Sequence, residues 1–506
     1  MSSVKVVIFD ESVLLLSAAQ NANDSAFRLR SGAYSLLRKL RQSKIRTGVS
    51  YGLGLSSDKV IALKRIATEY LCDCFLLDAS IDCVVNEINE AWGDNGGSIL
   101  YVVSENKDAV HKLSSHWLII VLGVKSESVS DNLSILYINK LEELPMTICK
   151  LNKKAAGKNA VIVGYVMKPA REEDFAKRGA FPMNPTPNGL IFVPLTFDTP
   201  LSSQLQVVDV VLHKATDEIM SVELGSNSES SNRVTYTSGM QELQRFLEHH
   251  SNFFAIDPLD NIYPVLDRLK IQLVLLGLQD INAEGCLTIR GAHFLKVNDF
   301  NESDLAQRLP EAKLSFPCIV KPQVACGVAD AHSMAIVFEI EDFKHLSVPL
   351  PAVVQEYINH SSTLFKFYVL GDTVFHAVKK SIPNSNTLRK SYARNGSKPI
   401  LFDSLKSLPT DTESQHPGDA VSCKVDLDLE LVIDAAKWLA RTLDLTIFGF
   451  DVVVQEGTRD HVIVDVNYLP SFKEVHNDIA IPAFWDAIKM KYESKKMKAA
   501  TPASSS

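Results

Sequence analysis

The sequence lacks the features that define several common protein classes. Only 8 of its 506 residues are cysteines, and they are scattered apart from Cys72 and Cys74, so neither a disulfide framework nor a zinc site is predicted. The net charge of −8 at pH 7 argues against a nucleic-acid-binding protein, which would carry a basic surface. No apolar run approaches the ~20 residues that span a bilayer, so no membrane span is expected.

Two further absences bear on location and on nucleotide binding. The segment from Met1 to Val7 lacks the basic start and the long apolar core of a signal peptide, and scattered cysteines fit a reducing compartment. We expect a monomer in the cytoplasm, with the nucleus as a second location.

The Walker pattern Gly-x-x-x-x-Gly-Lys-Ser/Thr does not occur, so a P-loop is excluded as a nucleotide site.

The first 150 residues alternate between apolar strands and helical patterns. Examples are the strand from Val4 to Phe9 and the helix from Val60 to Leu71. Repeated units of this kind predict a doubly wound parallel α/β sheet that is covered on both faces. At ~150 residues per domain, the whole chain has room for about three domains.

The first strand ends at Asp10, in Val6-Val-Ile-Phe-Asp10-Glu-Ser12. This stretch resembles the opening motif of the haloacid-dehalogenase-like fold, Asp-x-Asp, in which the first Asp is a nucleophile and the second an acid/base. Ser12 takes the second position and is a poor proton carrier. The later segment from Val103 to Asp108 keeps acidic residues but lacks the Gly-Asp pair of that fold. We therefore interpret this domain as a degenerate relative rather than an active phosphatase.

A hairpin is predicted near the C-terminal end, between Ile447 and Pro470, because two apolar β-branched runs flank a polar turn. Asp465 and Asn467 are two residues apart and share one strand face, and Asp451 lies on the partner strand. Three oxygen donors on one face suit Mg²⁺. The alternative is an amphipathic hairpin with surface polar residues, but the apolar flanks favour a metal because buried carboxylates need compensation.

Two upstream features fit an ATP site. Lys321 closes the strand that begins at Phe316 and is placed to meet a phosphate. The segment Gln355-Glu356-Tyr357-Ile358 ends another strand, where backbone groups can pair with an adenine edge. Together with the hairpin, this order of elements is similar to that of the ATP-grasp fold.

Residues 160–485 resemble the inositol 1,3,4-trisphosphate 5/6-kinase family, also called inositol-tetrakisphosphate 1-kinases, and the N-terminal addition is similar to that of the long plant members. The motifs that carry this resemblance stand in the family's order: Val163-Gly164-Tyr165, Leu212-His213-Lys214, Ile256-Asp257-Pro258-Leu259, Leu266-Asp267-Arg268, Phe316 to Pro322, Gly327, His332-Ser-Met334, Gln355 to Lys366, and Asp451 with Asp465-Val-Asn467.

The resemblance implies a role for each matching position. ATP would be bound by Arg268, Lys321, Gln355, Glu356, Tyr357, Ile358, Lys366, Ser381 and Ser397. The inositol polyphosphate would be bound by Arg171, Lys214, His332, Lys366, Asn467 and Ser471. Asp451, Asp465 and Asn467 would hold Mg²⁺, and Lys366 and Asp465 would be catalytic. The implied activity is transfer of the ATP γ-phosphate to an inositol tris- or tetrakisphosphate.

The resemblance also implies the domain order, a degenerate haloacid-dehalogenase-like domain followed by an ATP-grasp kinase core. We predict such a domain at 1–150, a linker at 151–159, an inositol-phosphate-binding domain at 160–255, an ATP-grasp domain at 256–490 and a disordered tail at 491–506. The basic segment from Leu388 to Arg394 is expected to be a mobile loop that either covers the phosphates or is a solvated charge run.

The chain departs from the family pattern at several positions in the expected site. Arg171 replaces a lysine, which keeps the charge but changes the geometry. Ser471 follows Pro470 where the family has glycine, which stiffens a place where substrate approaches the backbone. Cys326, Asp330 and Ser333 also differ. Two alternatives therefore stand beside the kinase: an ATP-grasp carboxylate–amine ligase, and an inositol phosphate-binding protein with little turnover.

Overall fold

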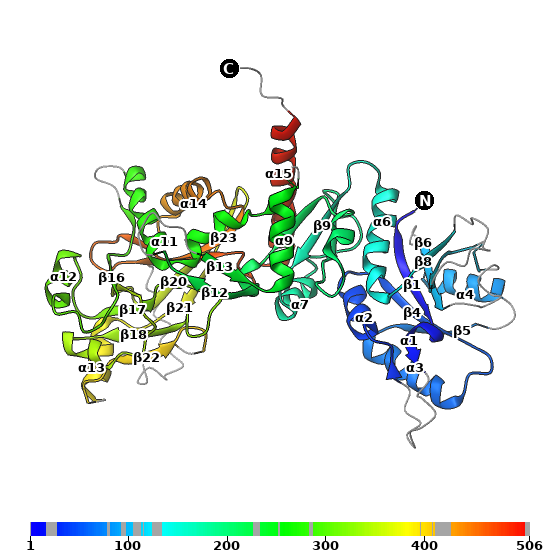
Figure 1. The fold of residues 1–506 in the computed structure, drawn as a ribbon, viewed down its shortest axis with the longest axis horizontal. Helices are drawn as coiled ribbons and strands as arrows, with labels where there is room; N and C mark the ends of the chain where they lie inside the picture. Colours follow the sequence, from blue (N-terminus) through cyan, green and yellow to red (C-terminus); the bar gives the residue numbers. More distant parts are fainter. Residues whose placement is uncertain are drawn as a thin grey trace. The chain divides into compact units, whose positions relative to one another are not determined.

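A computed structural model describes residues 2–16, 28–77, 81–92, 98–104, 113–114, 116–123, 134–225, 233–250, 253–282, 287–394, 396–406, 408–409 and 427–500. The chain forms two compact units, Met1–Leu212 and His213–Ser506, whose elements are labelled in Figure 1. Within the ranges just given, no helix combines the length and the apolar character needed to cross a membrane.

The first unit begins with a six-stranded parallel sheet of order β5-β4-β1-β6-β7-β8. Its central strand β1 is buried on both faces, as Val7, Ile8 and Phe9 show, and this matches the predicted doubly wound sheet. The strands are β1 (Val4–Asp10), β4 (Arg46–Gly52), β5 (Asp73–Leu77), β6 (Ser98–Ser104), β7 (Leu118–Leu122) and β8 (Ile135–Ile138). The helices are α1 (Glu11–Leu14), α2 (Ala33–Gln42), α3 (Ser57–Tyr70), α4 (Ile81–Trp92) and α6 (Leu144–Ala156), and β2 (Leu15–Leu16) pairs with β3 (Arg28–Leu29).

The second part of this unit is built on strands of order β10-β9-β11. Its elements are β9 (Val161–Val166), α7 (Pro169–Lys177), β10 (Leu190–Pro194), α8 (Leu201–Leu205) and β11 (Val210–His213). The predicted linker at 151–159 is wrong as far as Ala156, because helix α6 runs through it. Asn152 on this helix is buried and bonds the Val4 amide (2.6 Å) and the Met183 carbonyl (2.8 Å). The polar residues that suggested a linker thus include one that packs inside the unit.

The second unit contains two five-stranded sheets, of order β15-β24-β23-β20-β21 and β16-β19-β17-β18-β22. The first consists of β15 (Ile289–Gly291), β20 (Thr363–Leu370), β21 (Thr373–Lys380), β23 (Ile447–Val454) and β24 (His461–Tyr468). The second consists of β16 (Phe294–Val297), β17 (Cys318–Pro322), β18 (Ser333–Val337), β19 (Ala352–Glu356) and β22 (Ile400–Asp403). A hairpin of β12 (Ile219–Glu223) and β13 (Arg233–Tyr236) and the short strand β14 (Ala255–Ile256) precede them. The helices are α9 (Ser238–His249), α10 (Leu259–Ile262), α11 (Arg268–Leu275), α12 (Leu305–Glu311), α13 (Ser385–Arg394), α14 (Leu429–Leu443) and α15 (Asn477–Ala500), with 3-10 turns at Ala215–Glu218, Tyr263–Leu266, Leu276–Ile281 and Ile340–His345.

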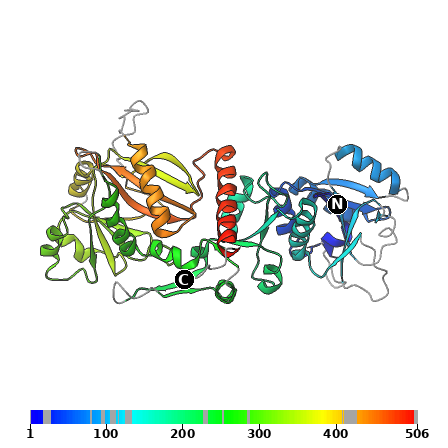
Figure 2. The same cartoon turned by 90° about the horizontal axis from the view of Figure 1, so that it is seen from above.

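The predicted C-terminal hairpin is formed by β23 and β24. Phe448, Phe450 and Val452 of β23 are buried, and because side chains alternate along a strand, Gly449 and Asp451 point to the opposite face. Helix α14 lies along this sheet (Figure 2, orange). It begins after Asp428, whose side chain accepts a hydrogen bond from the Leu431 amide (3.1 Å), so a cap fixes its first turn.

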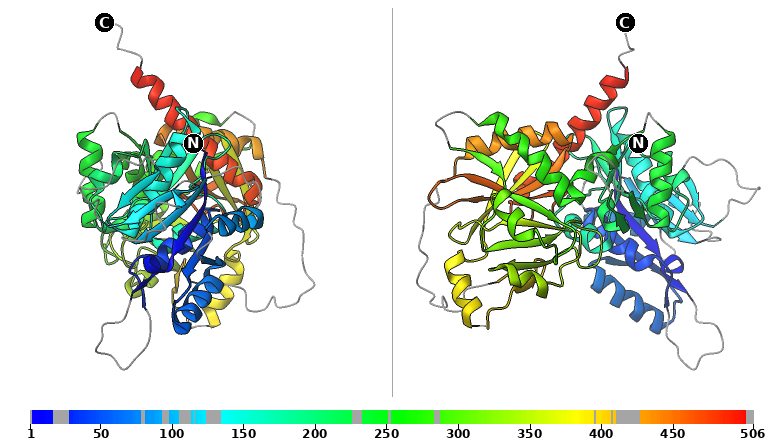
Figure 3. Two further views of the ribbon diagram at one scale, coloured as in Figure 1. Left: turned by 90° about the vertical axis from the view of Figure 1, so that its right-hand side faces the viewer. Right: turned by 60° about the vertical axis from the view of Figure 1, so that its left-hand side comes forward.

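Two segments that were expected to be irregular are helical. The predicted mobile loop at Leu388–Arg394 lies in α13, which is anchored by buried Leu388, by a bond from Arg389 to the Phe316 carbonyl (2.7 Å) and by one from Tyr392 to Glu339 (2.8 Å). Helix α15 continues to Ala500 (Figure 3, red), so the predicted disordered tail at 491–506 is wrong for residues 491–500. Lys, Glu, Met and Ala in this stretch are good helix formers, which outweighs its polarity.

Candidate functional site

Three charged side chains form a row across neighbouring strands of the first sheet of the second unit. Lys366 on β20 lies opposite Asp451 on β23, which lies opposite Asp465 on β24. Paired residues in antiparallel strands share a face, so all three point the same way. Nζ of Lys366 is 3.2 Å from both carboxylate oxygens of Asp451. Asn467, two residues beyond Asp465, donates from Nδ2 to Asp465 Oδ2 at 2.9 Å.

The donor set in this row fits a hard cation. Two carboxylates and one amide oxygen are the ligand types of Mg²⁺. Burial raises the pKa of Asp451 to about 6, although Lys366 opposes the shift, so its negative charge is only partly compensated. Among the described residues, no group of three or more His, Cys, Asp or Glu side chains gathers as a metal site. A cation at the predicted site therefore depends on Asn467 as its third ligand.

The side-chain ammonium of Lys321 lies beside the same row. It lies on β17, is 8% exposed and donates from Nζ to the Val464 carbonyl (3.2 Å), next to Asp465. Burial lowers the pKa of Lys321 to about 8, while Asp465 acts in the opposite direction and favours the charged form. The predicted phosphate ligand and the predicted metal ligands are thus brought together.

Arg268 is also buried, and its guanidinium donates hydrogen bonds to backbone carbonyls of the protein. Nη1 donates to the carbonyls of Pro322 (2.7 Å), Val324 (3.0 Å) and Ala331 (3.1 Å). The arginine therefore closes the loop between β17 and β18, which follows Lys321, the predicted phosphate ligand. Its contact with ATP stays a prediction, while its contact with this phosphate loop (residues 323–332) is direct.

Gly327 at the tip of the phosphate loop has no room for a side chain. Its φ is +83°, and an added Cβ would lie 2.8 Å from Cβ and Cδ1 of Ile219 on β12. Gly327→Ala is therefore expected to displace the loop and to raise KM for ATP about tenfold, roughly 1.4 kcal/mol of binding, with little change in KM for the second substrate. Steady-state kinetics measure both constants.

Gly157 provides the matched control, since its φ is +84° and an added Cβ meets nothing within 4 Å. Both alanine variants place a Cβ at a positive φ, and at Gly157 the ψ of −165° lies in a region that is nearly restricted to glycine, so both should lower the unfolding temperature. Equal KM values for ATP in the two variants would show that the loop does not position the nucleotide.

The segment predicted to bind adenine begins at the end of β19, and residues 356–362, between β19 and β20, are called the hinge. Gln355 is 2% exposed and pairs with Phe294 and Ile319 in the sheet. The Glu356 carboxylate is bound by Arg290 and by the His293 amide, and the Tyr357 hydroxyl donates to the Pro383 carbonyl. The side chains of Glu356 and Tyr357 are therefore engaged by the protein, and the backbone of Gln355 and Glu356 is held in the sheet. The predicted ATP role of these residues is compatible with that arrangement.

The two serines assigned to ATP differ in setting. Ser381 follows β21 and donates its amide to the Ser362 carbonyl (2.7 Å), so it lies next to the hinge. Ser397 is exposed, has a φ of +51° and donates its amide to the Tyr392 carbonyl (3.1 Å) after α13. The geometry therefore supports Ser381 more directly than Ser397.

Two of the residues assigned to the inositol phosphate lie at the edges of this site. Lys214 donates from Nζ to the Tyr468 carbonyl, and its Nζ is 5.3 Å from the centre of the Tyr468 ring, so it reaches the residue after Asn467. His332 ends the phosphate loop, and its Nδ1 is 3.3 Å from Ser404 Oγ. Burial and the nearby Arg268 lower the pKa of His332, which favours a neutral ring at pH 7.

Ser471 lies in the loop after β24, between Leu469 (φ +41°) and Phe472 (φ +38°). Left-handed backbone at two non-glycine residues is strained, so this loop is held by its surroundings. Glu474 supplies one anchor, since it accepts from the Tyr368 hydroxyl (2.6 Å) and pairs with Lys379. Arg171 is half-buried in the first turn of α7 in the first unit, and its role stays a prediction.

A buried network that the sequence did not single out supports the end of β24. Asp257 accepts from the Thr446 amide (2.8 Å) and hydroxyl (2.5 Å), and its own amide donates to the Tyr468 hydroxyl (2.9 Å). His213 is 2.7 Å from the Asp257 carbonyl. Burial raises the pKa of Asp257 to about 6 and lowers that of His213 to about 4. Asp257 and His213 occur in the quoted motifs, but Tyr468 had no sequence signal.

Asp10 in the first unit has both carboxylate oxygens engaged. Oδ1 accepts from the Ser12 amide (3.1 Å) and hydroxyl (2.5 Å), and Oδ2 accepts from Tyr101 (2.8 Å). Ser12 thus holds the carboxylate through two hydrogen bonds, and the interpretation of this domain as a degenerate relative stays a prediction. Of the predicted acidic segment from Val103 to Asp108, residues 105–108 lie outside the described ranges.

Comparisons with known proteins agree with this organisation. Residues 1–154 match the family model described as "ITPK4, N-terminal HAD-like domain", and residues 288–484 match the inositol 1,3,4-trisphosphate 5/6-kinase ATP-grasp domain. The chain is 48% identical over 504 residues to inositol-tetrakisphosphate 1-kinase 6 of Oryza sativa subsp. indica, covering 99% of this chain and 91% of that protein. It is 28% identical over 305 residues to inositol-tetrakisphosphate 1-kinase of Danio rerio, covering 59% and 70% of the two chains.

Similarity to solved structures is more distant. D-alanine–D-alanine ligase from Bacillus anthracis shares 14% identity at a TM-score of 0.39, covering 67% of this chain and 100% of that one. This similarity supports no conclusion about the site. The rice relative, in contrast, extends over both the N-terminal sheet and the row of Lys366, Asp451 and Asp465. The chain therefore belongs to the inositol-tetrakisphosphate 1-kinase family, with an N-terminal HAD-like domain and an ATP-grasp kinase domain.

Proposed function

We propose that the protein transfers the γ-phosphate of ATP to a hydroxyl of an inositol tris- or tetrakisphosphate, with Mg²⁺ as cofactor, in inositol phosphate and phytate metabolism. The observation that carries the proposal is the single sheet face on which Lys366, Asp451 and Asp465 are aligned, with Lys321 beside it. Phosphoryl transfer between two polyanions needs cations and metal ligands at one point, and family membership supports this reading.

Each end of ATP has candidate ligands in the second unit. The backbone from Gln355 to Ile358 would receive the adenine, and Lys321 and the loop closed by Arg268 would receive the phosphates. Asp451, Asp465 and Asn467 would hold Mg²⁺, which when bound neutralises charge on the phosphates and orients them.

The inositol phosphate would meet cationic and polar groups at the end of β24. Lys214 reaches Tyr468 there, and Asn467 and Ser471 lie on either side of that residue. Lys366 would lie between the two substrates, where its charge would stabilise the transferred group. An inositol hydroxyl attacks the γ-phosphorus in line, so catalysis rests on positioning and electrostatics rather than on covalent chemistry.

A substrate panel tests the proposal. The full chain is incubated with ATP, Mg²⁺ and a series of inositol tris- and tetrakisphosphates, and product positions are assigned by NMR. If the protein is a kinase, ADP should form only when an inositol phosphate is present. ADP formed only with a carboxylate and an amine would identify a ligase, and nucleotide binding without turnover on any isomer would identify a binding protein.

We further propose that the protein acts as a monomer in the cytoplasm, with the nucleus as a second location. The scattered cysteines support the reducing compartment in this proposal. Light scattering on the purified chain and fractionation of cells with a compartment marker test the two parts separately.

A further inference from the structure

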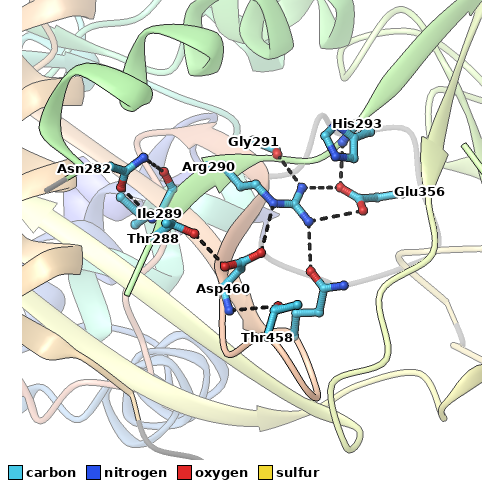
Figure 4. Close-up of polar contacts among 10 residues, drawn as sticks. Asn282, Thr288, Ile289, Arg290, Gly291, His293, Glu356, Thr458 and Asp460 are labelled. Carbon is cyan, nitrogen blue, oxygen red and sulfur yellow. Dashed lines mark hydrogen bonds and ion pairs between the residues drawn. The ribbon is translucent and has the colours of Figure 1, made fainter. Parts of the chain in front are cut away.

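Arg290 on β15 is the centre of a polar cluster that joins three segments of the second unit (Figure 4). Nη1 and Nη2 donate to the two carboxylate oxygens of Glu356, the latter at 3.3 Å, and Nη2 also donates to Gln455 Oε1 (2.9 Å). Nε lies 3.7 Å from Asp460 Oδ2. The side chains of Arg290 and Glu356 are 23% and 14% exposed, so this forked pair is largely shielded from water.

Glu356 is the last residue of β19 and the start of the hinge. Its amide donates to the His293 carbonyl (3.0 Å), and its carboxylate accepts from the His293 amide (2.7 Å). Both carboxylate oxygens are therefore engaged by donors of the protein, and these contacts fix the direction in which the hinge leaves the sheet. A charge-assisted fork is the strongest class of such contacts.

A second cluster joins the other end of the hinge to the same turn of the β23–β24 hairpin. Glu456 accepts from Ser361 Oγ and from Asn384 Nδ2 (2.7 Å), and its amide donates to the Asn359 carbonyl (2.9 Å). The hinge is thus attached at both ends to residues 455–460. This turn connects the strands that carry Asp451 and Asp465.

These attachments fix two places that one ATP molecule must contact together. The adenine would lie on the hinge, and the phosphates would lie at the row on β23 and β24. If the distance between the hinge and the row changes, the nucleotide loses contacts at one end. Such sites tolerate displacements of less than about 1 Å. The second substrate would lie at the end of β24, away from the hinge, and would be less affected by it.

We propose that Arg290 is a positioning residue for ATP, which holds the hinge in register with the hairpin that carries the metal ligands. It acts through Glu356 and through the turn at 455–460 and needs no contact with the nucleotide. This inference rests on the proposed function, because it takes the hinge as the adenine site.

Substitutions of Arg290 distinguish a role in positioning ATP from a role in folding stability alone. Arg290→Ala is expected to raise KM for ATP about tenfold, while kcat changes less than about threefold and KM for the inositol phosphate is unchanged. Arg290→Lys should give an intermediate KM, because an ammonium cannot form the fork. Glu356→Gln should weaken ATP binding in the same direction, and the double variant should be no worse than Arg290→Ala, since both remove one interaction.

Arg308 gives a matched control in the same unit. It pairs with Glu302 at similar exposure, 29% and 21%, and donates to the Lys296 carbonyl (2.9 Å), but it joins α12 to β16. Arg308→Ala should lower the unfolding temperature without changing KM for ATP. Equal KM values for ATP in the two alanine variants, or a parallel rise in KM for both substrates, would overturn the proposal.

Binding of ADP, measured by calorimetry, gives a readout that needs no inositol phosphate. Weaker ADP binding by Arg290→Ala than by wild type or Arg308→Ala supports the positioning role even if the substrate panel finds no kinase activity. Unchanged ADP binding by Arg290→Ala overturns it, whatever the panel shows.

Discussion

Replacing Asp465 with alanine is expected to lower kcat about a thousandfold, a loss on the order of 4 kcal/mol of transition-state stabilisation. Asp465 lies opposite Asp451 in the hairpin register and shares its face with Asn467. If these three residues hold the metal, the variant keeps one carboxylate and cannot form the site. Asp465→Asn should behave similarly, because an amide lacks the charge that retains a divalent cation.

The dependence on Mg²⁺ distinguishes this loss from unfolding. Wild-type turnover should saturate with Mg²⁺, whereas the Asp465 variants should require far more of it. Affinity for metal-free ATP should not weaken, since the charge removed is negative like that of the phosphates. Asp372→Ala, at an exposed position in the turn between β20 and β21, should leave all three quantities unchanged. An Asp465→Ala variant that keeps most of its rate would show that the metal assignment is wrong.

The sequence predicted those parts of the site that are local. The apolar runs around Asp451 and Asp465 define the hairpin, and a two-residue spacing places Asp465 and Asn467 on one face. Strand register was not predictable, because it depends on contacts between distant segments. The pairing of Lys366 with Asp451, and the bulge between Asp451 and Val452, therefore emerge only in three dimensions.

The errors share one physical cause. The segment at 388–394 and the segments at 151–156 and 491–500 are rich in lysine and arginine, and a polar composition favoured a loop, a linker and a tail. In the structure all three segments are helical, Leu388 and Asn152 are buried, and Lys153 and Lys491 form ion pairs with Asp209 and Asp444. Arg290 was missed because its partners, Glu356 and Asp460, are 66 and 170 residues away in the chain.

Replacing Lys321 with methionine is expected to lower kcat/KM for ATP by at least a hundredfold, roughly 3 kcal/mol, without loss of stability. Burial holds the pKa of Lys321 at about 8, against 10.5 for an ordinary lysine. The charged form therefore costs folding free energy at pH 7, and methionine removes that cost while it keeps the apolar stem. Lys344→Met, at an exposed lysine, is the control and should change neither the kinetics nor the unfolding midpoint.

The same pKa predicts opposite effects of pH on stability and on nucleotide binding. Between pH 8 and 10.5 the unfolded chain binds a proton that folded Lys321 has released, so this group raises the free energy of unfolding as pH rises through that window. Over the same range the folded protein loses the charge that attracts phosphate, so its affinity for metal-free ATP falls above pH 8. Lys321→Arg should abolish the alkaline fall in affinity, because a guanidinium stays protonated. Calorimetric titration with ATP from pH 7 to 10 tests this, and an identical alkaline fall in wild type and Lys321→Arg would assign it to another group.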